Sequence, residues 1–94
     1  MALEFSSGNV VGNSQFQLIF KGDGITASVS IDLEAAPFLL SLKTNKPREA
    51  VFTFGTDAPG SGSLNTDGTS VTVTFSPTLA SGQETSVYFQ LFYA

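Results

Sequence analysis

The sequence contains no cysteine, histidine or tryptophan. Without cysteine, the chain cannot form a disulfide scaffold, a zinc–thiolate site or a cysteine nucleophile. Without histidine, it cannot form a catalytic triad with a histidine base, and it lacks the commonest ligands of catalytic transition metals. These absences exclude the enzyme classes that depend on such side chains.

Charged side chains are scarce, at 13% of the sequence, and four basic residues against eight acidic ones give a net charge of −4. A protein that binds duplex nucleic acid needs clustered lysine and arginine to displace counterions from the phosphates. An anionic membrane surface attracts the same clusters. The sequence therefore predicts neither nucleic acid nor a membrane as a partner, since its basic residues are only Lys21, Lys43, Lys46 and Arg48.

Long apolar runs are also missing. No stretch approaches the roughly 18 consecutive apolar residues of a membrane-spanning helix. Residues 1–5 lack the basic and apolar regions of a secretory signal. We therefore expect a cytoplasmic or particle-associated protein rather than a secreted one. Residues 1–5 are interpreted either as the native start or as a flexible leader, such as a cloning remnant, ahead of the domain.

Phenylalanine supplies the apolar mass of the chain. The 94 residues include nine phenylalanines, and each aromatic side chain can bury about 150–250 Å². A chain of this length holds one domain with one core. No linker or internal repeat divides the sequence, so residues 1–94 are expected to form a single domain.

Apolar and polar residues alternate with a period of two, which is the pattern of a half-buried strand. In residues 25–33, for example, isoleucine, alanine, valine and leucine point one way while threonine, serine and aspartate point the other. Tight hairpins are expected at residues 22–24 and 66–68, and an exposed loop at residues 55–63. The predicted strands are residues 14–21, 25–33, 38–43, 50–54, 62–65, 70–75 and 85–93, and residues 3–5 and 10–11 could supply one more short strand.

These segments predict an all-β fold, a single-domain antiparallel β-sandwich of about seven or eight short strands. Parallel βαβ units are excluded because no crossover helix fits between the strands. The short Thr/Val strands and Gly/Asp turns resemble immunoglobulin-like or fibronectin-like modules, although the cysteine and tryptophan landmarks of immunoglobulin domains are missing. A jelly-roll-like sandwich is the alternative.

The acidic residues indicate no catalytic pair. Asp32 and Glu34 would lie about 7 Å apart on one strand face, but no carboxylate sits in an apolar run that would raise its pKa. Asp57 and Asp67 lie in predicted loops, where carboxylates and carbonyls could surround a calcium ion. The alternative is that aspartate simply suits turns. We therefore predict no catalytic residue, no metal site and no cofactor.

The last predicted strand carries aromatic side chains on both of its faces. Tyr88 and Phe92 alternate with Phe89 and Tyr93, although one face of a two-layer sandwich should meet water. A covering loop, a subunit interface or a stacked ligand such as a sugar ring would each explain this pattern. Residues 38–42 show the same two-sided pattern, so the candidate interface residues are Tyr88, Phe92, Tyr93 and Leu39.

The expected function is that of a non-catalytic structural or assembly module. Such a module would self-associate or pack into a larger array, so that a second copy or another protein is the expected partner. The alternative is a ligand-binding module for a glycan or calcium, which would use the end loops or the exposed aromatic side chains.

Overall fold

The computed structural model describes residues 4–12, 15–35, 38–40, 42 and 46–93, and the side chains from residue 15 onward. Its regular elements are all strands, which confirms the all-β prediction. No helix in these described ranges is long and apolar enough to cross a membrane. The strands are β1 (Glu4–Gly12), β2 (Gln15–Lys21), β3 (Ser28–Asp32), β4 (Glu49–Phe54), β5 (Gly60–Leu64), β6 (Ser70–Phe75) and β7 (Glu84–Phe92).

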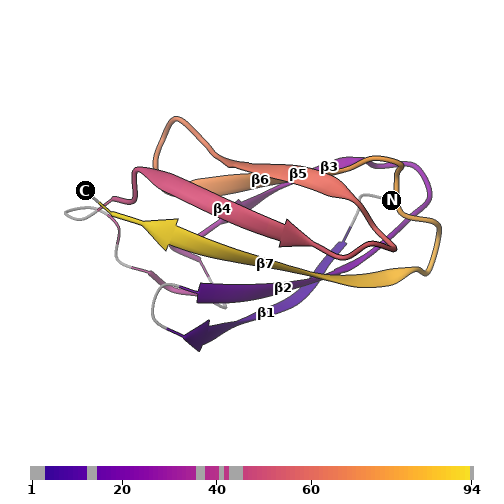
Figure 1. The fold of residues 1–94 in the computed structure, drawn as a ribbon, viewed down its shortest axis with the longest axis horizontal. Coiled ribbons are helices and arrows are strands. Elements are labelled where there is room, and N and C mark those ends of the chain that lie inside the picture. The colour runs from indigo at the N-terminus through magenta and orange to yellow at the C-terminus, as the bar shows by residue number, and fades with distance from the viewer. Residues whose placement is uncertain (1–3, 13–14, 36–37, 41, 43–45, 94) are drawn as a thin grey trace.

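The strands form two antiparallel sheets, one with the order β1-β2-β7-β4 and one with the order β3-β6-β5 (Figure 1). The strand pairing is nested: two strands from the first half of the chain pair with strands from the second half in reverse order. β2 pairs with β7 in the first sheet, and β3 pairs with β6 in the second. β5 and β6 form a hairpin, and β4 closes the free side of β7. The central strands β2, β7 and β6 therefore have neighbours on both sides.

The core is formed by every second side chain of the strands, because alternate residues point to the same face of a sheet. On β2 the buried positions are Phe16, Leu18 and Phe20, and on β6 every second residue from Val71 to Phe75 is buried. The ring centroids of Phe20 and Phe75 lie 5.4 Å apart in an edge-to-face arrangement, which joins the two sheets. The inward faces of both sheets therefore contribute to one apolar cluster.

The hairpin predicted at residues 22–24 is wrong, because the chain crosses there from one sheet to the other. The Asp23 carboxylate accepts hydrogen bonds from the backbone N–H groups of Ile25 and Thr26 at 2.9 and 2.8 Å. Gly24 donates its N–H to the Leu79 carbonyl. The Asp23 bonds shape the crossover itself, and the Gly24 bond holds it against the connection between β6 and β7. β3 begins only at Ser28, and Ile25, predicted to point inward, is 78% exposed.

The strand predicted at residues 38–43 is not formed at its described positions. The N–H groups of Phe38 and Leu39 both donate to the Ala35 carbonyl, as in a helical turn, and Leu39 has a φ of 55°. The ring of Phe38 packs edge-on against Phe16 and Phe89, with centroids 5.7 and 6.4 Å away. The apolar character of this segment therefore reflects closure of the core.

The loop predicted at residues 55–63 is shorter than expected, because β5 begins at Gly60. Gly62 serves close packing here: a Cβ atom at this position would lie 2.5 Å from Cγ of Phe52. The Phe52 ring of β4 thus lies directly on the backbone of β5. This contact joins the adjacent edges of the two sheets.

Candidate binding face on the four-stranded sheet

The outward side chains of β2, β7 and β4 form one face of the four-stranded sheet. The register places Gln17, Tyr88 and Thr53 side by side across the three strands. The next row along the strands contains Gln15, Gln90 and Val51. The middle of this face is therefore built from carboxamides, hydroxyls, one tyrosine ring and one valine.

Three large apolar side chains are exposed on this face. Val51 is 48% exposed, Tyr88 46% and Phe92 38%. Val51 lies opposite Gln90, which separates Tyr88 from Phe92 along β7. Val51, Tyr88 and Phe92 thus surround Gln90, and we call these three residues the outer patch.

Two of the four candidate interface residues lie in the outer patch, namely Tyr88 and Phe92. Tyr93 is only partly exposed and packs against the core. Leu39 is 69% exposed, but it belongs to the segment that follows β3, a strand of the other sheet. Sequence reasoning did not name Val51, although an outward valine in the alternating segment 50–54 was the available signal.

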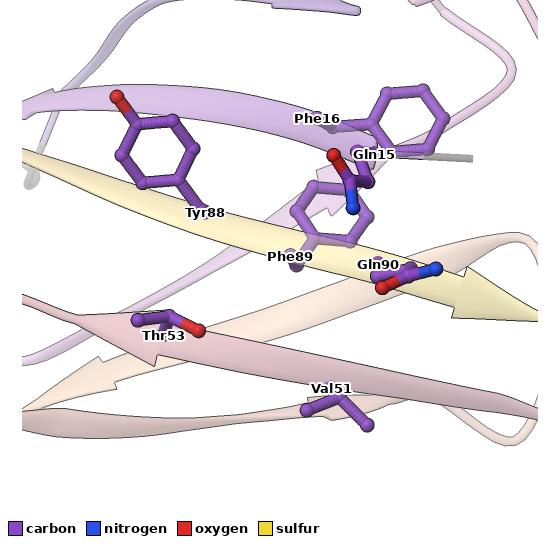
Figure 2. Close-up of a pocket in the computed structure, with 7 residues that line it drawn as sticks. All are labelled: Gln15, Phe16, Val51, Thr53, Tyr88, Phe89 and Gln90. Carbon is purple, nitrogen blue, oxygen red and sulfur yellow. The ribbon is translucent and has the colours of Figure 1, made fainter. Parts of the chain in front are cut away.

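A hollow of about 200 Å³ opens on this face next to Tyr88. Figure 2 shows Gln15, Gln90 and Tyr88 around it, with Val51 and Thr53 of β4 on the opposite side. A second hollow of about 490 Å³ shares Thr53 and Tyr88 with the first, and its lining includes Asp57 and Glu84. Tyr88 therefore lies where the two hollows meet.

The phenol of Tyr88 is held by the neighbouring strand. The side-chain amide of Gln17 donates to the Tyr88 hydroxyl oxygen at 3.1 Å and approaches the Ser86 hydroxyl at 3.4 Å. These contacts cross from β2 to β7. They fix the position of a ring that is nevertheless half exposed, which is the arrangement of a preformed contact surface.

Two of the carboxylates considered from the sequence, Asp67 and Asp32, accept local hydrogen bonds. The Asp67 carboxylate accepts from the N–H groups of Thr69 and Ser70 and from the Ser70 hydroxyl, and these bonds lower its pKa. Asp32 accepts from the N–H of Glu34 at 2.9 Å. Within the described ranges, no three acidic residues come together as a metal-binding group. The structure thus places Asp67 in the β5–β6 turn and Asp57 at the second hollow.

The outward face of the three-stranded sheet differs in composition. The hydroxyls of Ser28 and Thr74 are 2.7 Å apart, and those of Ser30 and Thr72 are 3.1 Å apart. Thr72 also donates to the Asn65 side-chain oxygen at 2.7 Å. The hydroxyls of this face therefore bond largely to one another, whereas the four-stranded sheet presents exposed apolar surface.

Comparison with known proteins found no family model, no curated protein and no solved structure that matches this chain.

Proposed function

We propose that this chain is a non-catalytic assembly module that binds a second copy of itself through the outer face of β2, β7 and β4. The observation that carries the proposal is the outer patch, in which Val51, Tyr88 and Phe92 are exposed around Gln90. Tyrosine and phenylalanine favour interfaces because they bring a large contact area with few rotatable bonds.

The charges around the outer patch also support contact between identical copies. Its centre is uncharged, since Gln15 and Gln90 lie side by side there. The charged pair Lys21 and Glu84 lies at the far end of the β2–β7 ladder, and the exposed Glu49, opposite Phe92, places one negative charge at the edge of the patch. An interface between two copies places the same patch on both sides, so a neutral centre avoids repulsion between like charges.

The nested strand order supports a jelly-roll type of β-sandwich as the architecture of the module. In an immunoglobulin domain the second strand pairs with the fifth, and the seventh lies beside the sixth. In this chain β2 pairs with β7, and β5 lies beside β6. The outgoing and returning halves of the chain thus pair with each other, as in a ribbon wound around the core.

Sedimentation equilibrium over micromolar to millimolar protein concentration tests the self-association. We expect the mass to rise with concentration from that of the 9.9 kDa chain to twice that value. The variant Val51→Lys places two like charges in a symmetric contact and should remain monomeric. The control Ser61→Lys adds the same charge at an exposed position of β5 and should associate like the original protein.

A protein that remains monomeric throughout this range would refute the proposal. So would a Val51→Lys variant that associates as strongly as the original protein.

A further inference from the structure

The hollow next to Tyr88 has an uncharged lining. Its seven lining residues are Gln15, Phe16, Val51, Thr53, Tyr88, Phe89 and Gln90, and the only ionisable group among them is the phenol of Tyr88. A charged ligand would lose its hydration there without gaining a counter-charge, which is unfavourable. The lining therefore selects for a neutral ligand.

The polar groups of the hollow suit a ligand that carries several hydroxyls. Each glutamine carboxamide offers two donors and one acceptor, and a threonine hydroxyl can donate and accept. Gln15 and Gln90 lie opposite each other on β2 and β7, with Thr53 on the far side of β7 (Figure 2). Neighbouring ligand hydroxyls could thus be bonded from more than one strand.

The Tyr88 ring adds a flat aromatic surface to these polar groups. The face of an aromatic ring carries partial negative charge and attracts the weakly positive C–H groups of a ligand. Because Gln17 already holds the hydroxyl of Tyr88, the ring needs little ordering when a ligand arrives. A ring molecule with C–H groups on its face and hydroxyls on its rim matches this combination, and a pyranose sugar has that form.

The size of the hollow limits the ligand to one ring at this position. Pockets for drug-sized molecules usually measure about 300–1,000 Å³, whereas this hollow measures about 200 Å³. The second hollow shares Thr53 and Tyr88 with it, so a longer chain could continue along the same face.

We propose that this hollow binds one ring of a neutral oligosaccharide, stacked on Tyr88 and hydrogen-bonded to Gln15 and Gln90. Val51 and Tyr88 belong both to the hollow and to the outer patch. A bound sugar and a second copy of the chain would therefore compete for this face. The competition, though not the sugar binding, rests on the proposed self-association.

Titration of ¹⁵N-labelled protein with maltotetraose, cellotetraose and tetra-N-acetylchitotetraose tests the site, with tetragalacturonate as the anionic control. We expect at least one neutral sugar to shift the side-chain amide signals of Gln15 and Gln90 at millimolar concentration, while tetragalacturonate leaves them unchanged. Tyr88→Ala should weaken binding at least tenfold, and Tyr88→Phe, which keeps the ring, should largely retain it. Ser61→Ala on β5 serves as the control, and thermal melts check that each variant is folded.

The site is refuted if none of the three neutral sugars shifts these signals, if tetragalacturonate binds equally well, or if folded Tyr88→Ala binds like the original protein. Sedimentation with and without the bound sugar separates the two proposals. A monomer that binds sugar contradicts only the self-association, and a dimer that binds none of the sugars contradicts only the sugar site. A dimer that binds sugar without dissociating contradicts the shared face.

Discussion

At the scale of single residues, the phenylalanine rings hold the two sheets together. Phe20 is fully buried and meets Phe75 of the other sheet edge-to-face, while Phe16 stacks on Phe89 within its own sheet at 5.0 Å. Removing a ring that bridges the sheets leaves a cavity that backbone movement closes only in part. The aromatic contacts between the sheets are therefore the most sensitive points of the core.

Phe20→Ala is expected to lower the free energy of unfolding by about 3–5 kcal/mol, as measured by urea denaturation. The matched control Gln15→Ala lies on the same strand, at an exposed position, and should change stability by less than about 0.5 kcal/mol. Equal effects of the two substitutions would contradict the register of β2.

Phe16→Ala should lower the free energy of unfolding by about 2–5 kcal/mol, because its ring is 3% exposed. Val29→Ala should lower it by less, because Val29 is only partly buried.

Gly62→Ala is expected to destabilise the protein by about 1–3 kcal/mol. The added methyl group would meet the Phe52 ring at 2.5 Å, so either the ring or the edge of β5 must move. Thermal or urea unfolding measures the loss, with Ser63→Ala at the next position as control, because Ser63 is exposed. A stability of Gly62→Ala equal to that of Ser63→Ala would show that Phe52 does not lie on β5.

Asp23 makes the stability depend on pH in the acid range. The backbone N–H groups of Thr26 and Ile25 donate to its carboxylate and lower its pKa from 3.8 to about 2. Because the folded pKa lies below that of the unfolded chain, the stabilisation is complete above about pH 5 and is lost as the pH falls towards 2. Asp23→Asn removes this titration, so the difference in unfolding free energy between the two proteins should shrink from pH 5 to about pH 2. A constant difference across this range would contradict the hydrogen bonds of Asp23.

At the scale of elements, the alternation of apolar and polar residues correctly predicts the strands in which every second residue faces the core. β2, β4, β6 and β7 all lie within one residue of the segments expected from the sequence. Alternation cannot tell which strand pairs with which, because inward residues look alike in either sheet. Alternation therefore predicts a hairpin at Gly22 and Gly24, whereas the structure pairs this segment with the connection that contains Leu79.

The strand prediction for the apolar segment 38–43 is wrong for a related reason. Short apolar runs do not distinguish a buried strand from a segment that caps the core. Phe38 enters the core from a turn, and only its tertiary contacts reveal that role. The glycines of β5 misled the prediction in the same way, because Gly62 is required by the ring that packs on it and not by a turn.

Hydrogen exchange is expected to follow the positions of the strands in the sheets. β2 lies between β1 and β7, β7 lies between β2 and β4, and β6 lies between β3 and β5, so the amides of these three strands should exchange most slowly. Amides of the edge strand β3 that do not pair with β6 should exchange markedly faster. Uniform protection of all strands, or slowest exchange in β3, would contradict the strand order.

At the scale of the whole molecule, the two outward faces have different chemistry. Serine and threonine hydroxyls pair with one another on the three-stranded sheet, whereas the four-stranded sheet exposes Val51, Tyr88 and Phe92.

The sequence predicts part of this face. It indicates Tyr88 and Phe92, because aromatic residues stand on both sides of one strand. It could not place Leu39, because the sheet to which a connecting segment belongs depends on tertiary structure. The hollow at Tyr88 also depends on three strands that are distant in sequence.

At this scale the account rests on two copies of the chain binding each other through the outer face of β2, β7 and β4. Backbone amide chemical shifts recorded at increasing protein concentration test it most directly, because each strand reports separately. We predict concentration-dependent shifts confined to β7 and its neighbours, centred on Val51, Tyr88, Gln90 and Phe92. Shifts centred on Ser28, Ser30, Thr72 and Thr74 of the other sheet, or a spectrum unchanged by concentration, would contradict the claim.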